Sequence, residues 1–403
     1  MQNRSSDGDT QKETDDGRGF SRFTARVSAA IHLTQLVVLL ILLVVPGVAA
    51  QASDDYATVS GACNLTFPAD HGAHPDYRTE WWYYTGNLTD ENNAHLGFQL
   101  TFFRSRILSP GEEQKWPSEK SPWRTAHLFM AHAAISDFSR NRFYHAQKLA
   151  RGAVGLAGAV QTHRQVQIFI ADWHARIAPE RHELQASAPQ FSMKLTSLPT
   201  KPPILHGEKG YSRKGNSPDR ASCYYSFTRM ATRGTVQIQD KSLRVKGNAW
   251  MDHEFSSAPL DPEAVGWDWF SLQFDDDTEL MLFVIRQKNG IDSPASSGTW
   301  ITATAQARHL PRSAFTVEGL DTWTSPHSKA RYPCRWQVSV PSLALDLTIA
   351  PNLPDQELHT GPTTGVIYWE GSVAVTGTRN GNPIAGSGYV ELTGYASPFD
   401  APL

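Results

Sequence analysis

One strand-like stretch occurs twice in the chain, and this repeat decides the fold. The two copies are Val245-Lys246-Gly247-Asn248-Ala249-Trp250-Met251-Asp252-His253 and Ile384-Ala385-Gly386-Ser387-Gly388-Tyr389-Val390-Glu391-Leu392. Aligned without a gap, Gly247 meets Gly386 and Asp252 meets Glu391. The chain is therefore expected to consist of two similar units, each of which contains this stretch.

Apolar and polar residues alternate in both copies, which is the pattern of a β-strand with one buried face. In the first copy Val245, Ala249 and Met251 share the apolar face with His253. In the second copy the position of His253 is taken by Leu392. A titratable ring on an otherwise apolar face makes His253 the first candidate site residue.

Each unit also begins on an aromatic-rich hairpin. The predicted strands are 80–88 and 96–104 in the first unit, and 266–274 and 279–286 in the second. Short alternating segments fill the rest, and helical periodicity of any length is absent. Many short strands with polar turns predict an all-β fold of two tandem antiparallel β-barrels.

The expected barrels cover residues 64–256 and 264–397. Before them, Arg18, Arg22 and Arg26 precede the apolar run Leu36–Val45, which is followed by small residues, as in a secretory signal peptide. We therefore interpret residues 1–52 as a signal peptide, with an uncleaved membrane anchor as the alternative. Either way the body of the protein is expected to be exported, periplasmic or secreted, and held at the inner membrane if the segment stays attached.

Composition excludes some classes of function. A net charge of -3 from 37 basic and 40 acidic residues gives no sign of nucleic-acid binding. The three cysteines, Cys63, Cys223 and Cys334, allow one disulfide and leave its pairing open. There is no G-x-S-x-G motif and no βαβ pattern, so a serine hydrolase of that type is not expected.

Six motifs resemble the AttH/CrtC-like family of exported proteins, often labelled carotenoid 1,2-hydratase or lipocalin-like. They are D-H-G-A-H-P-D-Y-R-T-E-W-W-Y-Y-T-G-N-L from Asp70, G-Y-S-R-K-G from Gly210, A-S-C-Y-Y-S-F-T-R from Ala221, W-M-D-H-E-F from Trp250, G-W-D-W-F-S-L-Q from Gly266 and R-Y-P-C-R-W from Arg331. The resemblance covers roughly 64–395. It implies two lipocalin-like barrels that hold an extended apolar molecule, and some relatives hydrate an isolated C=C bond.

Two functions of different classes follow from this resemblance. The first is an enzyme, a hydro-lyase that acts on a C=C bond of an isoprenoid or lipid-like molecule by acid-catalysed hydration or a related step. The second is a non-catalytic carrier of a hydrophobic ligand, with components of an inner-membrane transporter as partners. Both functions require a small apolar ligand, and neither requires a cofactor.

Hydration of an unactivated alkene needs a proton donor, π-faces that stabilise the carbocation, and a positioned water molecule. We expect His253 to be the acid or a proton relay, and Asp252 or Asp268 to orient it or supply the proton. Glu80 and His71 are further acid-base candidates at the barrel mouth. The rings expected to line the ligand site are Trp82, Tyr84, Phe98, Trp250 and Trp269.

A purely structural role is the alternative for the same residues. His253 would then be a core histidine whose ring nitrogens both have hydrogen-bond partners, and Asp252 and Glu254 would form salt bridges. In the run Trp81–Tyr84, alternate rings should fill the first barrel while the others pack against the second barrel.

The histidines ahead of the first hairpin raise the question of a metal ion. The spacing of His71 and His74, with Glu80 six residues further on, is compatible with metal ligands. No second ligand pair of fixed spacing follows them. The sequence therefore predicts no metal site.

Overall fold

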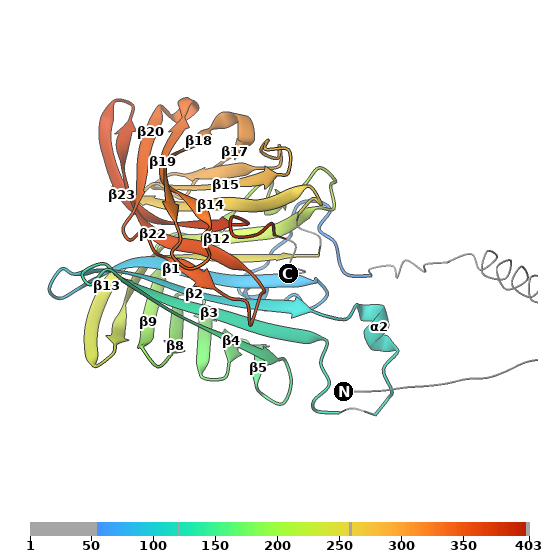
Figure 1. Ribbon diagram of the computed structural model, residues 1–403. Helices are drawn as coiled ribbons and strands as arrows, with labels where there is room; N and C mark the ends of the chain where they lie inside the picture. The colour runs from blue at the N-terminus through green and yellow to red at the C-terminus, as the bar shows by residue number, and fades with distance from the viewer. Residues whose placement is uncertain (1–54, 120, 258–259, 400–403) are drawn as a thin grey trace, which may run out of the picture. The chain divides into compact units, whose positions relative to one another are not determined.

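The first strand of each unit pairs with its last strand. The computed structural model describes residues 55–119, 121–257 and 260–399. In it β1 (Thr79–Asp90) pairs with β13 (Lys241–Ser256), and β14 (Ala264–Phe274) pairs with β23 (Asn382–Thr393). The repeated stretch thus forms β13 and β23, which occupy equivalent places in two sheets (Figure 1).

The first sheet has 13 strands and curls into a nearly closed barrel. Its main path runs β4-β3-β2-β1-β13-β12-β9-β8-β7-β6-β5. The bounds are β2 (His95–Arg106), β3 (His127–Asp137), β4 (Arg142–Arg151), β5 (Ala157–Gln161), β6 (Val166–Ile170), β7 (Trp173–Ala178), β8 (Arg181–Ser187), β9 (Phe191–Pro199), β10 (Ile204–Leu205), β11 (Tyr211–Arg213) and β12 (Ala221–Ile238).

The second sheet has 10 strands and forms a half-barrel along the path β17-β16-β15-β14-β23-β22-β20-β19-β18. Its remaining strands are β15 (Glu279–Gln287), β16 (Ser297–Ile301), β17 (Ala307–Pro311), β18 (Thr316–Thr324), β19 (Arg331–Val340), β20 (Leu345–Pro351), β21 (Glu357–His359) and β22 (Ile367–Arg379). In the described chain, helical structure is limited to α2 (Pro110–Gln114) and three short 3-10 turns. The prediction of an all-β fold with two tandem lipocalin-like barrels is confirmed.

Strand alternation distributes the aromatic residues of β1 between two cores. Trp82 and Tyr84 belong to the core of the first barrel, whereas Trp81 and Tyr83 pack with Trp269 in a layer between the two sheets. Both sheets lie in the single compact unit that begins at residue 55. The expectation that alternate rings fill the barrel and pack against the second unit is confirmed.

The aligned glycines of the repeat allow neighbouring strands to approach closely. A Cβ atom on Gly247 would lie 2.0 Å from the carbonyl oxygen of Asn87 in β1. In the second sheet a Cβ atom on Gly386 would lie 2.3 Å from the carbonyl oxygen of Gln273 in β14. The same steric requirement therefore acts at the same place in both units.

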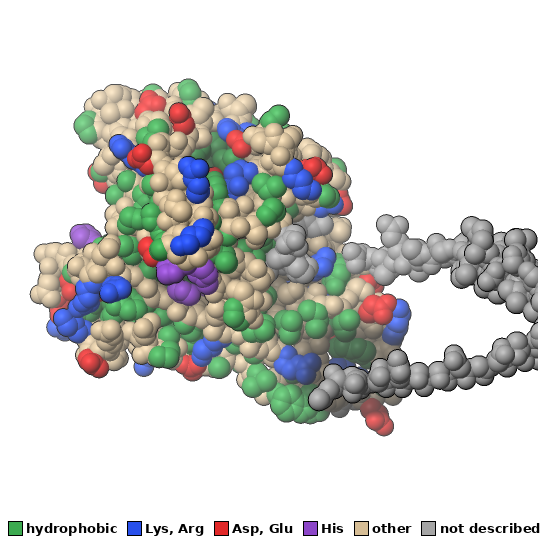
Figure 2. Space-filling view, in the orientation of Figure 1, with side chains coloured by type: hydrophobic (Ala, Val, Ile, Leu, Met, Phe, Trp, Pro, Cys, Tyr) green, Lys and Arg blue, Asp and Glu red, His purple; other side chains and the backbone are tan. Residues whose placement is uncertain are grey.

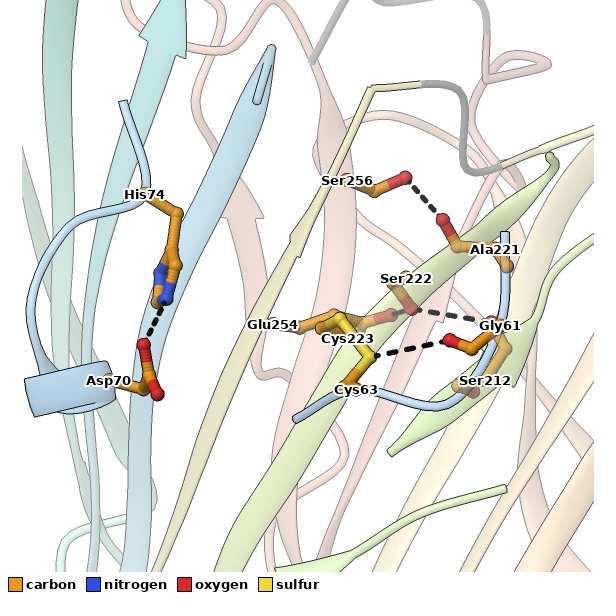
Figure 3. The surroundings of a disulfide bond; sticks show 10 residues. All are labelled: Gly61, Cys63, Asp70, His74, Ser212, Ala221, Ser222, Cys223, Glu254 and Ser256. Atoms are coloured by element: carbon orange, nitrogen blue, oxygen red, sulfur yellow. Dashed lines mark hydrogen bonds and ion pairs between the residues drawn. A yellow bond between two sulfur atoms is a disulfide. The ribbon is translucent and has the colours of Figure 1, made fainter. Parts of the chain in front are cut away.

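A disulfide joins Cys63, ahead of β1, to Cys223 in β12, and Cys334 is free (Figure 3). The pair packs with Val59, Ala221 and Phe255 in a small apolar cluster. This bond fixes the pairing that the sequence left open. It ties the segment that precedes the first hairpin to β12, which lies two strands from β1 in the sheet.

Replacing both Cys63 and Cys223 by serine should lower the free energy of unfolding by about 4 to 5 kcal/mol. The bond spans 160 residues, and closing so long a loop removes much entropy from the unfolded chain. Urea unfolding with and without the substitutions measures the change, and Cys334→Ser is the control. Equal midpoints for the double variant and the control would contradict the prediction.

Charged residues of both signs are interspersed on the face of the protein shown in Figure 2. This agrees with the nearly balanced count of 37 basic and 40 acidic residues. The face therefore lacks the basic stripe that marks many nucleic-acid-binding proteins.

The predicted signal peptide or anchor, residues 1–52, lies outside the described residues. Within the described ranges, no helix is both long and apolar enough to span a bilayer.

Candidate functional site

Strand β13 contributes to two groups of polar residues, one on each face of the first sheet. Met251 and His253 point into the first barrel, while Trp250 and Asp252 point toward the second sheet. Residues adjacent in a strand face opposite ways. The expectation that Asp252 orients His253 is therefore wrong, although both residues are buried.

The first group, which we call the histidine cluster, consists of His71, His74, Glu80, Arg104, Tyr225 and His253. At its centre, one oxygen of Glu80 lies 2.8 Å from Nε2 of His253 and 2.8 Å from Nδ1 of His74. Arg104 donates to the other oxygen at 2.8 Å. Burial raises the pKa of Glu80, but the hydrogen bonds from the two histidines and the charge of Arg104 outweigh it and hold this pKa well below its usual range.

A chain of hydrogen bonds continues from His253. Its Nδ1 lies 3.0 Å from the hydroxyl of Tyr225, which lies 2.6 Å from Nδ1 of His71. Burial, together with the nearby His253, lowers the pKa of His71 to about 4. Trp82 stacks on His253 with ring centroids 4.8 Å apart. Because both nitrogens of His253 are bonded within the cluster, neither is left for direct proton transfer to a ligand.

The first barrel holds another histidine that sequence reasoning missed. Nδ1 of His182 lies 3.0 Å from the hydroxyl of Tyr84, and its Nε2 has no hydrogen-bond partner in the described part of the chain. His182 shares the apolar face of β8 with Leu184 and Ala186. The pattern that singled out His253 would have found it. Tyr84, like Trp82 and Phe98, lies in the core of this barrel, and the expectation that these three rings line a ligand site stays a prediction.

Asp268 belongs to neither group. It lies on β14 opposite Leu392, and its carboxylate accepts hydrogen bonds from Arg286 at 2.9 Å and from the hydroxyl of Tyr395 at 3.0 Å. The expectation that Asp268 orients His253 is wrong, because β14 places it in the second sheet within an ion pair of its own.

The second group lies between the sheets, and we call it the acid layer: Tyr83, Thr85, Gln99, Thr101, Asp252, Glu370 and Glu391. Trp250 donates to Asp252 at 2.6 Å, and Tyr224 donates to its other oxygen at 2.8 Å. Trp269 in turn donates to Tyr224 at 3.1 Å. Trp250 and Trp269 are thus rings of this layer, and the expectation that they line the same site as Trp82 is wrong.

Two residues of the acid layer that carry carboxyl groups are neighbours on adjacent strands. Glu370 on β22 lies opposite Glu391 on β23 in the strand register. Burial, followed by the charge of Glu391, raises the pKa of Glu370 well above its usual range. Burial also raises the pKa of Glu391 to about 7. Two enclosed carboxylates side by side repel each other, so this pair holds a proton near neutral pH.

Five buried polar atoms gather beside this pair. They are the hydroxyls of Tyr83, Thr85 and Thr101, Oε1 of Gln99 and Oε1 of Glu370. The side chains of Tyr83 and Glu370 interact with each other, while the other three atoms have no hydrogen-bond partner among the described residues. Tyr83 lies opposite Thr101 and Thr85 opposite Gln99, so four of them form one patch on β1 and β2. Gln99 Nε2 donates to the second oxygen of Glu370, which places the patch against that carboxyl.

Sequence reasoning missed Glu370 and this patch. Glu391, however, aligns with Asp252 in the repeat, and both carry carboxyl groups on the outward face of the closing strand. Their charges interact across the layer. The repeat therefore contained a signal for an acidic site between the two units.

The free energy of unfolding should fall by about 2 kcal/mol between pH 5 and pH 7 because of Glu391. Its pKa in the folded protein, about 7, exceeds the usual value, so the folded state binds this proton more tightly than the unfolded state. That stability is present at low pH and is lost as the pH rises through about 7. Urea unfolding at several pH values measures this. Glu391→Gln should make the free energy of unfolding depend less on pH, and the same pH dependence in both proteins would contradict the prediction.

The family model described as AttH-like matches residues 58–395. The chain belongs to the AttH-like family. A crystal structure of a protein assigned as AttH from Nitrosomonas europaea is 36% identical, covers 84% of this chain and 99% of that one, and has a TM-score of 0.73. No curated protein matches this AttH-like chain.

A second solved structure shares the fold of this AttH-like protein at low identity. Kievitone hydratase from Nectria haematococca is 13% identical, covers 85% of this chain and 96% of its own, and has a TM-score of 0.62. At that identity the likeness extends to the fold alone. The fold of this chain is thereby shared with a protein of much lower sequence identity than the one from Nitrosomonas europaea.

Proposed function

We propose that this AttH-like protein adds water across an isolated C=C bond of an isoprenoid-like molecule held in the acid layer. The observation that carries the proposal is the cross-strand pair Glu370 and Glu391, buried between the sheets with the hydroxyl of Tyr83 against Glu370. When their environments give two neighbouring carboxyl groups different pKa values, the group with the higher pKa serves as the proton donor and the other serves as the base.

Glu370 is the proton donor in this proposal. Burial and the charge of Glu391 raise its pKa well above the usual range, which favours the neutral carboxylic acid. Glu391, with a pKa of about 7, suits a general base that accepts a proton from water.

The surrounding side chains supply the other requirements of hydration. Tyr83 and Trp269 pack edge to face with ring centroids 5.2 Å apart, and Trp250 packs on Trp269 at 6.3 Å. Such π-faces stabilise a carbocation electrostatically. The unpartnered oxygens of Thr85 and Thr101 are acceptors and donors that can hold a water molecule.

The residues of this site account for every bond and proton of the proposed reaction. The O–H bond of Glu370 breaks as its proton forms a C–H bond with one alkene carbon, which leaves a cation at the other carbon. Water forms a C–O bond there, and its extra proton passes to Glu391. Because Glu391 lies opposite Glu370, the proton returns between them and restores the starting state.

Export is part of the proposal. The disulfide Cys63–Cys223 supports an oxidising compartment such as the periplasm or the exterior. The name of kievitone hydratase, which shares the fold, also supports a hydratase over other enzymes of this architecture.

Incorporation of labelled oxygen tests the function. The protein is incubated in H2¹⁸O with squalene or geranylgeraniol, and the extract is analysed by mass spectrometry. Addition of one ¹⁸O-labelled water molecule, dependent on the protein, is the expected result. Saturable binding of these molecules with no incorporation would overturn the enzymatic proposal in favour of a carrier that delivers its ligand to a membrane transporter.

A further inference from the structure

We propose that His74, Glu80 and His253 bind a divalent transition-metal ion, with Zn²⁺ the best match, at one end of the first barrel. The three ligand atoms, Nδ1 of His74, Oε1 of Glu80 and Nε2 of His253, lie within 4.8 Å of one another. Both ring nitrogens approach the same carboxylate oxygen at 2.8 Å. This site is separate from the acid layer and does not depend on the proposed hydration.

Two histidines and one carboxylate are a ligand set that suits zinc and leaves a fourth position open. A metal ion placed among the three atoms would replace the two hydrogen bonds between rings and carboxylate by coordinate bonds. The three residues come from the loop before β1, from β1 and from β13. His253 lies 173 positions from Glu80, and for this reason the spacing of histidines in the sequence did not reveal the set.

Outer partners hold each of the three ligands, as is usual around protein metal sites. Nε2 of His74 lies 3.1 Å from Asp70, a contact drawn in Figure 3. Nδ1 of His253 lies 3.0 Å from the hydroxyl of Tyr225. Arg104 donates to the second oxygen of Glu80 at 2.8 Å and so leaves the first oxygen to the metal.

Aromatic packing fixes the planes of both rings. His74 stacks on Phe255 with centroids 3.6 Å apart and planes 13° apart. His253 stacks on Trp82 at 4.8 Å and 25°. The orientations of the two rings are therefore fixed before a metal ion binds, which favours affinity.

The charges of the site also permit a divalent ion. The negative charges of Glu80 and Asp70 offset part of the positive charge of the metal ion and of the Arg104 guanidinium. The metal-bound site keeps one net positive charge, as does a zinc site built from two neutral histidines and one carboxylate. Arg104 is thus compensated by Asp70 and does not exclude a cation.

Zinc content and cobalt spectra test this site directly. The full-length chain without a tag is equilibrated with Zn²⁺, freed of excess ion and analysed by mass spectrometry, and Co²⁺ binding is followed by its visible absorption. One tightly bound equivalent is expected. His74→Phe keeps the stacking on Phe255 but removes a ligand, and should weaken binding at least about 100-fold. His359→Phe, which alters an outlying histidine beside Glu357, should change nothing.

The readout is metal content, so it is independent of any turnover. A wild-type protein that retains no stoichiometric zinc, or equal retention by His74→Phe, would overturn the assignment. Should His74→Phe fail to fold, Tyr225→Phe decides instead, because it removes the hydroxyl that bonds His253 and His71 but leaves all three ligands in place, and it should weaken binding about tenfold. Unchanged affinity in that variant would also overturn the site.

Discussion

Glu370→Gln should lower the rate of water addition by about 10² to 10⁴-fold, the usual contribution of a positioned general acid. Glutamine has the shape of the neutral acid but cannot release a proton to carbon. Its amide oxygen can still accept the hydrogen bond from Gln99, so the acid layer should keep its structure. Initial rates of ¹⁸O incorporation for wild type and variant measure the loss.

The choice of controls separates chemistry from folding. Glu318→Gln makes the same chemical change at an exposed position of the second sheet and should leave the rate unchanged. Thermal unfolding should show that Glu370→Gln is at least as stable as wild type near neutral pH, since it removes an enclosed acid. A folded Glu370→Gln protein with full activity would eliminate Glu370 as the proton donor.

Arg104→Met should lower the free energy of unfolding by about 3 to 5 kcal/mol, the cost of leaving a buried carboxylate without its charge partner. Arg104 is only 2% exposed. Its guanidinium donates to Glu80 at 2.8 Å and to the carbonyls of His74 and Tyr77 at 2.9 Å each. Methionine keeps much of the aliphatic volume and removes all three interactions. Urea unfolding at neutral pH measures the change.

The matched control for Arg104 is a partly exposed arginine in the same barrel. Arg176 lies 3.7 Å from Glu183 near the surface, and Arg176→Met should cost less than about 1 kcal/mol. A similar small loss in Arg104→Met would mean that water replaces the guanidinium and that the histidine cluster is not sealed from solvent.

Much of the fold could be predicted because its signals are local. The alternation in 245–253 and 384–392 gave the closing strands, and the aromatic runs gave the opening hairpins. Alternation also assigned His253 to the barrel interior and Trp81 and Tyr83 to the other face. The same rule should have separated Asp252 from His253, since neighbours in a strand cannot share a face.

By itself the sequence determined the all-β class, the duplication and the face on which each strand residue lies, because these depend on the two-residue period of a single strand. Only the tertiary structure decided which strands are neighbours, in what register, and whether a sheet closes. Register set Glu370 against Glu391, and the pairing of β1 with β13 brought His253 to Glu80. Such contacts join positions far apart in the chain, where no local pattern encodes the partner.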